Sequence, residues 1–321
     1  MVPLISAIVP IYNGEAYIAK IMNCFKAQTF QNFEVIFVND GSTDETMSKL
    51  IENINHSSEK YKVFSQENRG VSAARNLGID YASGQYICFI DVDDEIHELF
   101  FEILYNTVAQ SKEEIAFCMA SHNHCKINKS IIKTVSYSSD IVLEKLLFSK
   151  ISTGIWGMII PTKLLKDNNL KFKEGFNYSE DLHMVWRVVS FSKVIHQIKC
   201  SLYIYNENEG SAMTVINNNR FDSMLLMEDL ELFFEKNNST FFPLFKKYGK
   251  SRMSWSLLWQ AAHYLNFNEF KEFTKKYEFK KDLVKLKDYP SLKVNLSSKI
   301  FLFSSLLYFL SVKVLMRNYR K

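Results

Sequence analysis

Apolar segments of two kinds alternate through the first part of the sequence, and this alternation restricts the chain to a small set of folds. One kind is a short run that is apolar on both faces, as in a strand buried within a parallel sheet, and the other has apolar residues at helical spacing. The predicted strands are residues 4–11, 33–39, 61–65 and 86–90, and the predicted helices between them include 15–28 and 71–81. Alternation of this kind implies right-handed crossovers, so the sequence predicts an α/β fold with an open, mostly parallel sheet and flanking helices.

Each of these predicted strands is followed by a polar cluster. In an open parallel sheet, ligands bind at the carboxyl ends of the strands, which is where such clusters meet. The clusters are Pro10-Ile11-Tyr12-Asn13, Asn39-Asp40-Gly41-Ser42, Glu67-Asn68-Arg69-Gly70 and Asp91-Val92-Asp93-Asp94. We interpret them together as one pocket of nucleotide size.

The fourth cluster places three carboxylates within four residues. Because side chains alternate along a strand, we expect Asp91 and Asp93 to share one face and Asp94 to turn away. Adjacent carboxylates repel one another unless a cation or strong hydrogen-bond donors compensate. Mg²⁺ or Mn²⁺ does this, since such ions take one or two carboxylates together with phosphate oxygens and water. The alternative is a solvated acidic turn that caps a helix starting near Ile96.

Two common nucleotide-binding loops are missing from the sequence. The turn after the first strand has no G-x-G-x-x-G pattern, and there is no Walker-type lysine loop. This argues against NAD-dependent enzymes and P-loop NTPases. What remains is a nucleotide held mainly by side chains, with its diphosphate bridged to the protein by a metal ion.

Beyond residue 110 the alternation loosens, and a second acidic site follows. The predicted elements here are strands at 114–120, 131–135, 155–160 and 201–205 and a helix at 140–148. Glu180 and Asp181 lie in the first turn of a further helix, which Ser179 is suited to cap. Their alternative role is to compensate the helix dipole. From Arg220 onward the sequence is helical.

Charge is distributed unevenly along the chain, whose net charge is +4. Residues 1–100 carry 14 acids against 7 basic residues, whereas residues 271–321 carry 13 basic residues against 4 acids. The final apolar stretch, 298–316, is interrupted by serines and Lys313 and is too broken for a spanning helix. We expect an amphipathic, basic helix that contacts an anionic membrane surface, with packing on the protein's own core as the alternative.

The five cysteines are odd in number and scattered, a pattern typical of a reduced, cytosolic protein. His122, His124 and Cys125 lack a second ligand pair at zinc-finger spacing, so we expect an ordinary loop there. The N-terminus has no basic region and runs directly into a strand, so no signal peptide is expected. We expect a cytoplasmic protein that can associate peripherally with the inner face of the cell membrane.

Five motifs occur in a fixed order along residues 4–212. They are Ser6-Ala7-Ile8-Val9-Pro10-Ile11-Tyr12-Asn13, Val38-Asn39-Asp40-Gly41-Ser42-Thr43-Asp44, Asn68-Arg69-Gly70-Val71-Ser72-Ala73-Ala74-Arg75-Asn76-Leu77-Gly78, Asp91-Val92-Asp93-Asp94 and Glu180-Asp181. This ordered set resembles the family 2 glycosyltransferases, of the kind that build capsular and other bacterial surface polysaccharides. One departure is Asn39, which stands where the family more often has an aspartate, while Asp40 is intact.

The resemblance implies a GT-A fold, which has a Rossmann-like, mostly parallel sheet with flanking helices and here precedes a helical C-terminal region. We expect a catalytic domain at 1–215, a helical region at 216–297 and the basic tail helix at 298–321. The implied reaction is an inverting, metal-dependent transfer from a UDP-sugar to a hydroxyl of a glycan, which we expect to be lipid-linked.

The resemblance also implies roles for single residues in binding the nucleotide. Pro10 and Tyr12 would flank the nucleobase, and Asp40 would accept a hydrogen bond from the uracil ring. Asp91 would contact the ribose or the sugar. The wider nucleotide-sugar site comprises Asn13, Ser42, Asn68, Arg75 and, in a loop at 206–214, Ser211.

The remaining implied roles are chemical. Asp93, with Asp91, would bind Mn²⁺ or Mg²⁺ at the leaving diphosphate, and Asp181 would be the base that deprotonates the acceptor hydroxyl. Glu180 is the first alternative for the base. This agrees with the chemistry of glycosyl transfer, which requires a neutralised leaving group and a separate base.

Three rival functions are weighed against the transferase. A sugar-nucleotide pyrophosphorylase would need a glycine-rich, lysine-bearing loop after the first strand, where the sequence has Asn13-Gly14-Glu15. A non-catalytic partner subunit would be indicated by loss of the acids, yet they are all present. A nucleic-acid binder is disfavoured because the basic residues gather on one amphipathic tail and not around the pocket.

Overall fold

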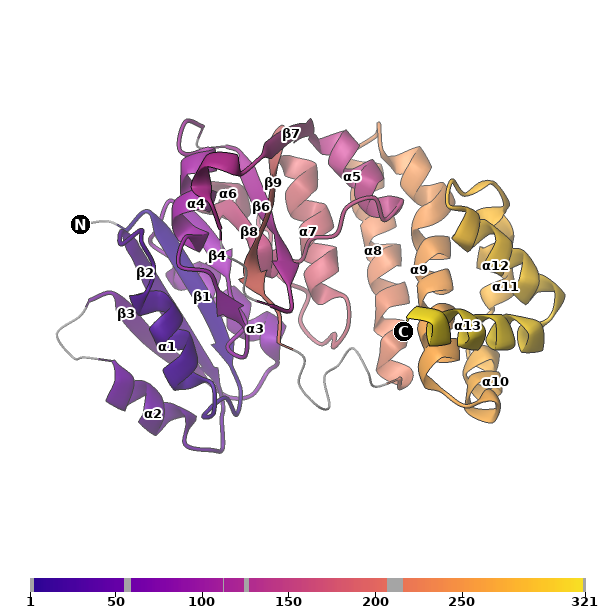
Figure 1. Ribbon diagram of the computed structural model, residues 1–321, viewed down its shortest axis with the longest axis horizontal. Helices are drawn as coiled ribbons and strands as arrows, with labels where there is room; N and C mark the ends of the chain where they lie inside the picture. The colour runs from indigo at the N-terminus through magenta and orange to yellow at the C-terminus, as the bar shows by residue number, and fades with distance from the viewer. Residues whose placement is uncertain (1–2, 55–58, 112, 124–126, 207–215, 320–321) are drawn as a thin grey trace. The chain divides into compact units, whose positions relative to one another are not determined.

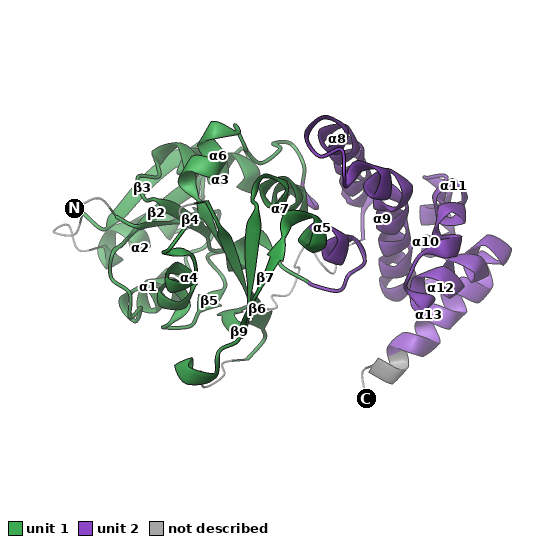
Figure 2. Cartoon of the chain, turned by 90° about the horizontal axis from the view of Figure 1, so that it is seen from above, with its two compact units in different colours: residues 1–142, 152–176, 180–207 green, residues 143–151, 177–179, 208–321 purple. Residues whose placement is uncertain are grey.

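The computed structural model describes residues 3–54, 59–111, 113–123, 127–206 and 216–319, and it forms two compact units. Unit 1 comprises Met1–Val142, Ser152–Phe176 and Glu180–Glu207, and unit 2 comprises Leu143–Ile151, Asn177–Ser179 and Asn208–Lys321 (Figure 2). The domain boundary expected at 215 falls within 207–215, outside the described residues.

Unit 1 is built on one mixed sheet (Figure 1). Its strands are β1 (Ile5–Ile11), β2 (Phe33–Asp40), β3 (Tyr61–Gln66), β4 (Tyr86–Phe89), β5 (Glu95–Ile96), β6 (Ile115–Ser121), β7 (Thr134–Ser138), β8 (Met158–Pro161) and β9 (Val194–Ile204). They are ordered β3-β2-β1-β4-β8-β6-β9-β5, and β7 also pairs with β9.

The first four strands are parallel, as the sequence predicts. β1 lies between β2 and β4, and β2 pairs with β3. The register aligns their carboxyl ends, with Ile11 opposite Asn39 and Asp40 opposite Gln66. The polar clusters that follow these strands therefore lie along one edge of the sheet.

The second half of the sheet is mixed. β8 is antiparallel to β4 and β6, whereas β6 and β9 are parallel. Several predicted boundaries were wrong here. Residues 129–131 form a 3₁₀ turn ahead of β7, residues 155–157 form another ahead of β8, and β9 begins at Val194, before the expected 201. Short apolar runs do not distinguish a strand from a neighbouring turn, which explains these misplacements.

The helices of unit 1 cover both faces of the sheet. They are α1 (Ile18–Lys26), α2 (Thr46–Asn53), α3 (Val71–Tyr81), α4 (Phe100–Val108), α6 (Thr162–Asp167), α7 (Glu180–Phe191) and the start of α5 (Ser139–Leu147), whose remainder from Leu143 belongs to unit 2. Figure 2 shows α1 and α4 on one side of the sheet and α3 and α6 on the other. The buried face of α1 contributes Ile18, Ile21, Met22 and Phe25 to the core, each stabilising the fold by about 1.5–3 kcal/mol.

Close approach of α3 to β1 depends on Gly78. A Cβ at this position would lie only 2.3 Å from Cγ2 of Ile8 in β1. Only glycine therefore lets the helix backbone pack directly on the strand. Arg75 lies one turn earlier on α3, so this contact sets its position at the edge of the sheet.

Unit 2 is helical. Its helices are α8 (Asp222–Asn237), α9 (Phe242–Tyr264), α10 (Phe267–Lys275), α11 (Phe279–Leu283), α12 (Leu292–Phe303) and α13 (Ser305–Tyr319). The stretch expected to be one tail helix is divided at Ser304, whose extended backbone ends α12. Within the described residues, no helix has the length and apolar character needed to cross a membrane.

Candidate active site

The loops after β1 and β2 are joined by side-chain hydrogen bonds. The Asn13 backbone N–H donates to Ser42 Oγ at 3.0 Å, and Asn13 Oδ1 accepts from the Thr43 N–H at 2.8 Å. Asn13 has φ +50°, a left-handed conformation that asparagine tolerates better than most residues. Pro10 is buried within β1, whereas Tyr12 is 52% exposed next to the Asn13 turn.

Asp40 organises the loop between β3 and α3. The carboxylate is 3% exposed and accepts three hydrogen bonds, from Gln66 Nε2 at 2.7 Å, the Arg69 N–H at 2.9 Å and the Gly70 N–H at 2.8 Å. A carboxylate has about four lone-pair sites, so one remains on Oδ2. The predicted bond from a uracil ring would use that site, and it stays a prediction.

Asn39, which stands where the family more often has an aspartate, closes the turn after β2. Its side chain is 5% exposed, and Oδ1 accepts from the Ser42 N–H at 3.1 Å. An amide oxygen closes this turn as a carboxylate oxygen would. Next to it, Gly41 has φ +70°, and a Cβ there would lie 2.7 Å from the Asn68 nitrogen. The loops after β2 and β3 are therefore in direct contact.

The acidic cluster forms a turn and not the end of a strand. β4 ends at Phe89, and the Asp94 N–H donates to the Asp91 carbonyl at 3.2 Å. The strand alternation that we expected to align Asp91 with Asp93 is therefore wrong as a reason for their placement. The capping alternative is also wrong, because β5 intervenes and α4 begins only at Phe100.

Residues that the sequence analysis missed hold this turn in place. The Tyr203 hydroxyl, on the fully buried part of β9, accepts from the Asp91 N–H at 3.1 Å. Asn206 donates its N–H to Asp94 Oδ1 at 2.9 Å and its Nδ2–H to the Asp93 carbonyl at 2.7 Å. Burial raises the pKa of Asp94 to about 7, despite the hydrogen bond from Asn206. The end of β9 is thus tied to the acidic turn.

Arg75 joins the two acidic sites. Its side chain is 5% exposed, and its guanidinium contacts Asp91 Oδ1 at 2.8 Å and Glu180 Oε1 at 3.3 Å. Burial alone would lower the pKa of Arg75, but the charges of Asp91 and Glu180 outweigh burial and raise it. One buried cation therefore fixes the distance between the turn after β4 and the start of α7.

Glu180 and Asp181 both have carboxyl groups that hold protons more tightly than usual. Burial is the main cause for each; it raises the pKa of both, and the neighbouring Asp181 charge adds to the effect at Glu180. Asp181 Oδ1 accepts from the Leu182 N–H at 2.6 Å, and among described residues no basic group lies within 4 Å of its carboxylate. Ser179, just before the helix, has φ +66°, a strained conformation of the kind found at functional sites.

Comparison with known proteins decides the family. The model for "Glycosyl transferase family 2" matches residues 6–159. "Glycosyltransferase GlyG" of Streptococcus pneumoniae serotype 4 is 31% identical over 249 residues, which are 74% of this chain and 80% of GlyG. The chain belongs to glycosyltransferase family 2. Another relative from that organism, "Glycosyltransferase GlyA", is 29% identical over 227 residues. This match covers 66% of this chain but only 32% of GlyA.

Solved structures of this fold extend over almost the whole family 2 chain. S. aureus TarS 1-349 in complex with UDP-GlcNAc has a TM-score of 0.65 at 20% identity, covering 98% of this chain and 91% of TarS 1-349. The mannosyltransferase PcManGT of Pyrobaculum calidifontis, in complex with GDP-Man and Mn²⁺, has a TM-score of 0.57 at 14% identity, covering 98% and 87%. These likenesses show the GT-A fold and the helical C-terminal region that follows it.

The predicted metal ligands of this family 2 protein suit a hard divalent cation. Asp91 and Asp93 offer carboxylate oxygens from one turn, and both side chains are partly exposed. No described group of three or more histidine, cysteine, aspartate or glutamate residues forms a complete protein-only metal site. Two carboxylates suit Mg²⁺ or Mn²⁺, whose remaining coordination positions are filled by phosphate oxygens and water. The assignment of Asp93 stays a prediction, as does that of Ser211, which lies outside the described residues together with His124 and Cys125.

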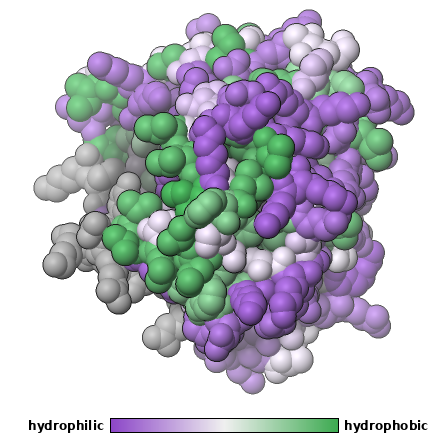
Figure 3. Space-filling model, turned by 90° about the vertical axis from the view of Figure 1, so that its right-hand side faces the viewer, coloured by the Kyte–Doolittle hydropathy of each residue, from purple (hydrophilic) through white to green (hydrophobic). Residues whose placement is uncertain are grey.

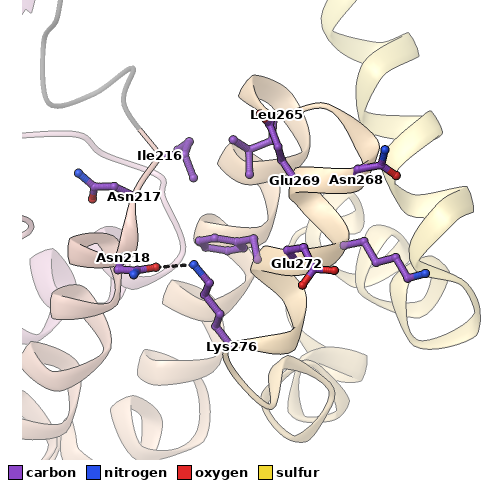
Figure 4. Close-up of a pocket in the computed structure, with 10 residues that line it drawn as sticks. Ile216, Asn217, Asn218, Leu265, Asn268, Glu269, Glu272 and Lys276 are labelled. Carbon is purple, nitrogen blue, oxygen red and sulfur yellow. Dashed lines mark hydrogen bonds between the residues drawn. The ribbon is translucent and has the colours of Figure 1, made fainter.

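Figure 4 shows a pocket in unit 2 that does not contain these acids. It is lined by Ile216, Asn217, Asn218, Leu265, Asn268, Glu269, Lys271, Glu272, Phe273 and Lys276. Several of its polar groups have structural partners: Lys276 donates to Asn218 at 2.6 Å, and Glu269 completes a capping box with Asn266 at the start of α10. We therefore do not assign the transfer chemistry to this pocket.

Removal of the Arg75 charge is expected to destabilise the site. Arg75→Met leaves Asp91 and Glu180 without their cation, so we expect the free energy of unfolding to fall by about 3 kcal/mol. This is the lower end of the usual range, because the Asp91 side chain is 29% exposed. Arg75→Lys keeps the charge but not the fork that reaches both acids, so it should lose less. Urea unfolding measures both variants, and an unchanged midpoint for Arg75→Met would contradict the bridging role.

Proposed function

We propose that this family 2 protein transfers a sugar from a UDP-sugar to a hydroxyl of a glycan acceptor, with inversion at the anomeric carbon. The observation that carries the proposal is the pair of acidic sites held apart by Arg75. An inverting displacement needs a stabilised leaving group on one side of the sugar and a base on the other. Sugar transfer or hydrolysis measured on UDP-sugars tests it.

The turn after β4 is the proposed leaving-group side. Asp93 and Asp91 would hold Mn²⁺ or Mg²⁺, which when bound neutralises the charge that develops on the departing UDP. Asp91 is oriented from two directions, by Arg75 at its side chain and by Tyr203 at its N–H. Asp94 and Asn206 keep the turn itself in shape.

The start of α7 is the proposed base side. A base works best when its pKa lies near the operating pH, and burial raises the pKa of both carboxyls there. The Glu180 carboxylate forms an ion pair with Arg75 at 3.3 Å. Asp181 has no such ion pair among the described residues, which supports it as the group that takes the acceptor proton, with Glu180 positioning the helix.

The nucleotide is proposed to be UDP. The remaining lone pair of Asp40 suits the ring N–H of uracil, and Tyr12 is exposed beside the turn that would hold the base. TarS binds UDP-GlcNAc, but PcManGT binds GDP-Man, so the fold by itself does not choose the base.

We expect UDP to bind more tightly than GDP, because a purine is larger and presents different groups at its edge. Calorimetric titration of both nucleotides in the presence of Mn²⁺ measures this. Asp40→Asn keeps the shape of the side chain and should narrow the difference. Equal affinities for UDP and GDP in the wild-type protein would count against the assignment of Asp40.

The acceptor is proposed to be lipid-linked and presented at the inner face of the cell membrane. The basic balance of residues 271–321, which have 13 basic residues against 4 acids, supports attraction to anionic lipid. This would bring the site to a membrane-bound acceptor of surface polysaccharide synthesis. A pyrophosphorylase is not favoured, since the turn at Asn13 and Gly14 is occupied by hydrogen bonds to Ser42 and Thr46 and carries no lysine.

A further inference from the structure

The last two described helices, α12 and α13, are apolar on two opposite faces. One face packs inside unit 2 and includes Val294, Phe301, Tyr308, Phe309 and Val312, each less than 9% exposed. Tyr308 and Phe309 contact the ring of Phe270 in α10, at centroid distances of 6.2 and 5.4 Å. The tail is therefore part of the core of unit 2, as the alternative in the sequence analysis had it.

The other face of the same two helices carries exposed large apolar side chains. Eight of the twenty exposed large hydrophobic side chains of the described chain lie between Leu292 and Leu315. They are Leu292, Leu296, Phe303, Leu306, Leu307, Leu310, Val314 and Leu315. We call these eight the hairpin face. A set of exposed large apolar side chains such as the hairpin face is typical of an interaction surface.

The side chains of the hairpin face are arranged as stripes. On α12, Leu292, Leu296 and Phe303 recur at helical spacing, and on α13, Leu307, Leu310 and Val314 do the same. Leu292 is 80% exposed and Phe303 84% exposed, so these two protrude from the surface. Figure 3 views the molecule from the right-hand side of Figure 1. It shows hydrophobic side chains gathered near the centre of that side, with hydrophilic ones to the right and below.

The charged residues in this last part of the sequence have one sign. Residues 289–321 include six basic residues and no acid. Lys293 and Lys299 are exposed on α12, and Lys293 also lies 3.9 Å from the Trp259 ring centroid. A second copy of the chain docked face to face would bring these positive charges together, which disfavours self-association. An anionic bilayer offers both an apolar interior and negative headgroups.

We infer that the hairpin face of α12 and α13 is the membrane-docking surface, entering the interfacial region of an anionic bilayer with its basic residues against the headgroups. This inference rests on the proposed membrane-linked acceptor, and it names the surface that brings the enzyme there. Because the opposite face is core, docking orients unit 2 rigidly and does not depend on a detachable tail. Cutting the chain after Ser297 would remove Phe301, Tyr308 and Val312 from the core, so truncation is not a clean test.

The test uses the purified full chain and a double variant, Leu292→Ser with Phe303→Ser. Both side chains are more than three-quarters exposed, so folding should be unaffected. The protein is sedimented with vesicles of phosphatidylcholine, with or without phosphatidylglycerol, at low and high salt. We expect wild-type binding to vesicles that contain phosphatidylglycerol and its loss at high salt. The double variant should bind at least about tenfold more weakly than the wild type, since two large apolar side chains no longer enter the bilayer.

A matched control is the pair Leu232→Ser and Ile131→Ser, whose side chains are 67% and 72% exposed but lie outside the hairpin face. The control should bind vesicles like the wild type. If Leu292→Ser with Phe303→Ser alters urea unfolding, Lys293→Glu with Lys299→Glu replaces it and should weaken binding to the anionic vesicles alone.

Two results would overturn the inference. One is vesicle binding by the double variant equal to that of the wild type. The other is a wild-type dimer in sedimentation equilibrium that the double variant converts to monomer, which would make the hairpin face a self-association surface. UDP release from UDP-sugars in the absence of vesicles is measured in parallel. If it is absent while vesicle binding persists, the proposed transferase function fails and the docking surface stands.

Discussion

Asp93→Ala is expected to abolish sugar transfer. Asp93 is the proposed principal ligand of the divalent ion, and without the ion the departing diphosphate carries uncompensated negative charge in the transition state. A chelator should have the same effect on the wild type, and added Mn²⁺ or Mg²⁺ should restore activity to the wild type but not to the variant. Initial rates of UDP release with each metal measure this.

Glu98→Ala serves as the control for the loss of a nearby acid. Glu98 is exposed and follows β5, outside the turn of Asp91 to Asp94, so this variant should keep its activity. Urea unfolding of Asp93→Ala checks that the site is still folded, since the Asp93 carbonyl holds Asn206 through the backbone and not the side chain. Full turnover in excess chelator would contradict the assignment of Asp93 as a ligand of a required divalent ion.

Asp181→Asn is expected to lower turnover by about 10²- to 10⁴-fold, the usual range for loss of a general base. The affinity for UDP should stay within a few-fold, because Asp181 lies on α7 and not in the loops around Asp40. Single-turnover rates and UDP titrations separate the two effects. Glu180→Gln is the companion variant, and it should reduce activity less if Glu180 only positions the helix.

The pH dependence follows from the same carboxyl. Burial raises the pKa of Asp181, and a base is active only when it is deprotonated. Turnover of the wild type should therefore fall as the pH is lowered through a value above the ordinary aspartate range, and this acid limb should vanish in Asp181→Asn. Near-normal turnover of Asp181→Asn would move the role elsewhere, first to Glu180.

The part of the site that follows strands β1 to β4 was predictable from the sequence, because it depends on short segments that are contiguous in the sequence. Each of β1 to β4 is a short apolar run followed directly by polar residues, and parallel pairing brings those residues to one edge of the sheet. The pairing of β1 with β2 and β4 confirms this, and the Asn13–Ser42 and Asp40–Gly70 hydrogen bonds follow from it. The family motifs lie in the same stretch.

The supporting contacts were not predictable, because they come from distant parts of the chain. Tyr203 lies in a strand whose apolar pattern gives no sign of a polar role, yet its hydroxyl holds Asp91 across 112 positions. Arg75 was assigned to the nucleotide-sugar site, which stays a prediction, but the bridge that its guanidinium forms between Asp91 and Glu180 was not foreseen. Only the order of β4, β8, β6 and β9 within the sheet places these segments together.

The acidic turn illustrates how a correct residue choice can rest on a wrong reason. Strand alternation was expected to align Asp91 and Asp93, but β4 ends two residues before Asp91. The turn is set by the Asp94 N–H bond to Asp91 and by Asn206. A run such as Phe89-Ile90-Asp91 does not reveal where hydrogen bonding to neighbouring strands stops.

UDP release by the purified chain is measured on a panel of UDP-hexoses and UDP-N-acetylhexosamines, with Mn²⁺ and with excess chelator. We predict that at least one donor releases UDP with Mn²⁺ by slow hydrolysis, in which water takes the place of the acceptor hydroxyl, that chelation stops the release, and that Asp93→Ala releases none. Release that continues unchanged in excess chelator, or no release from any donor while Mn²⁺ is present, would contradict a metal-dependent UDP-sugar transferase.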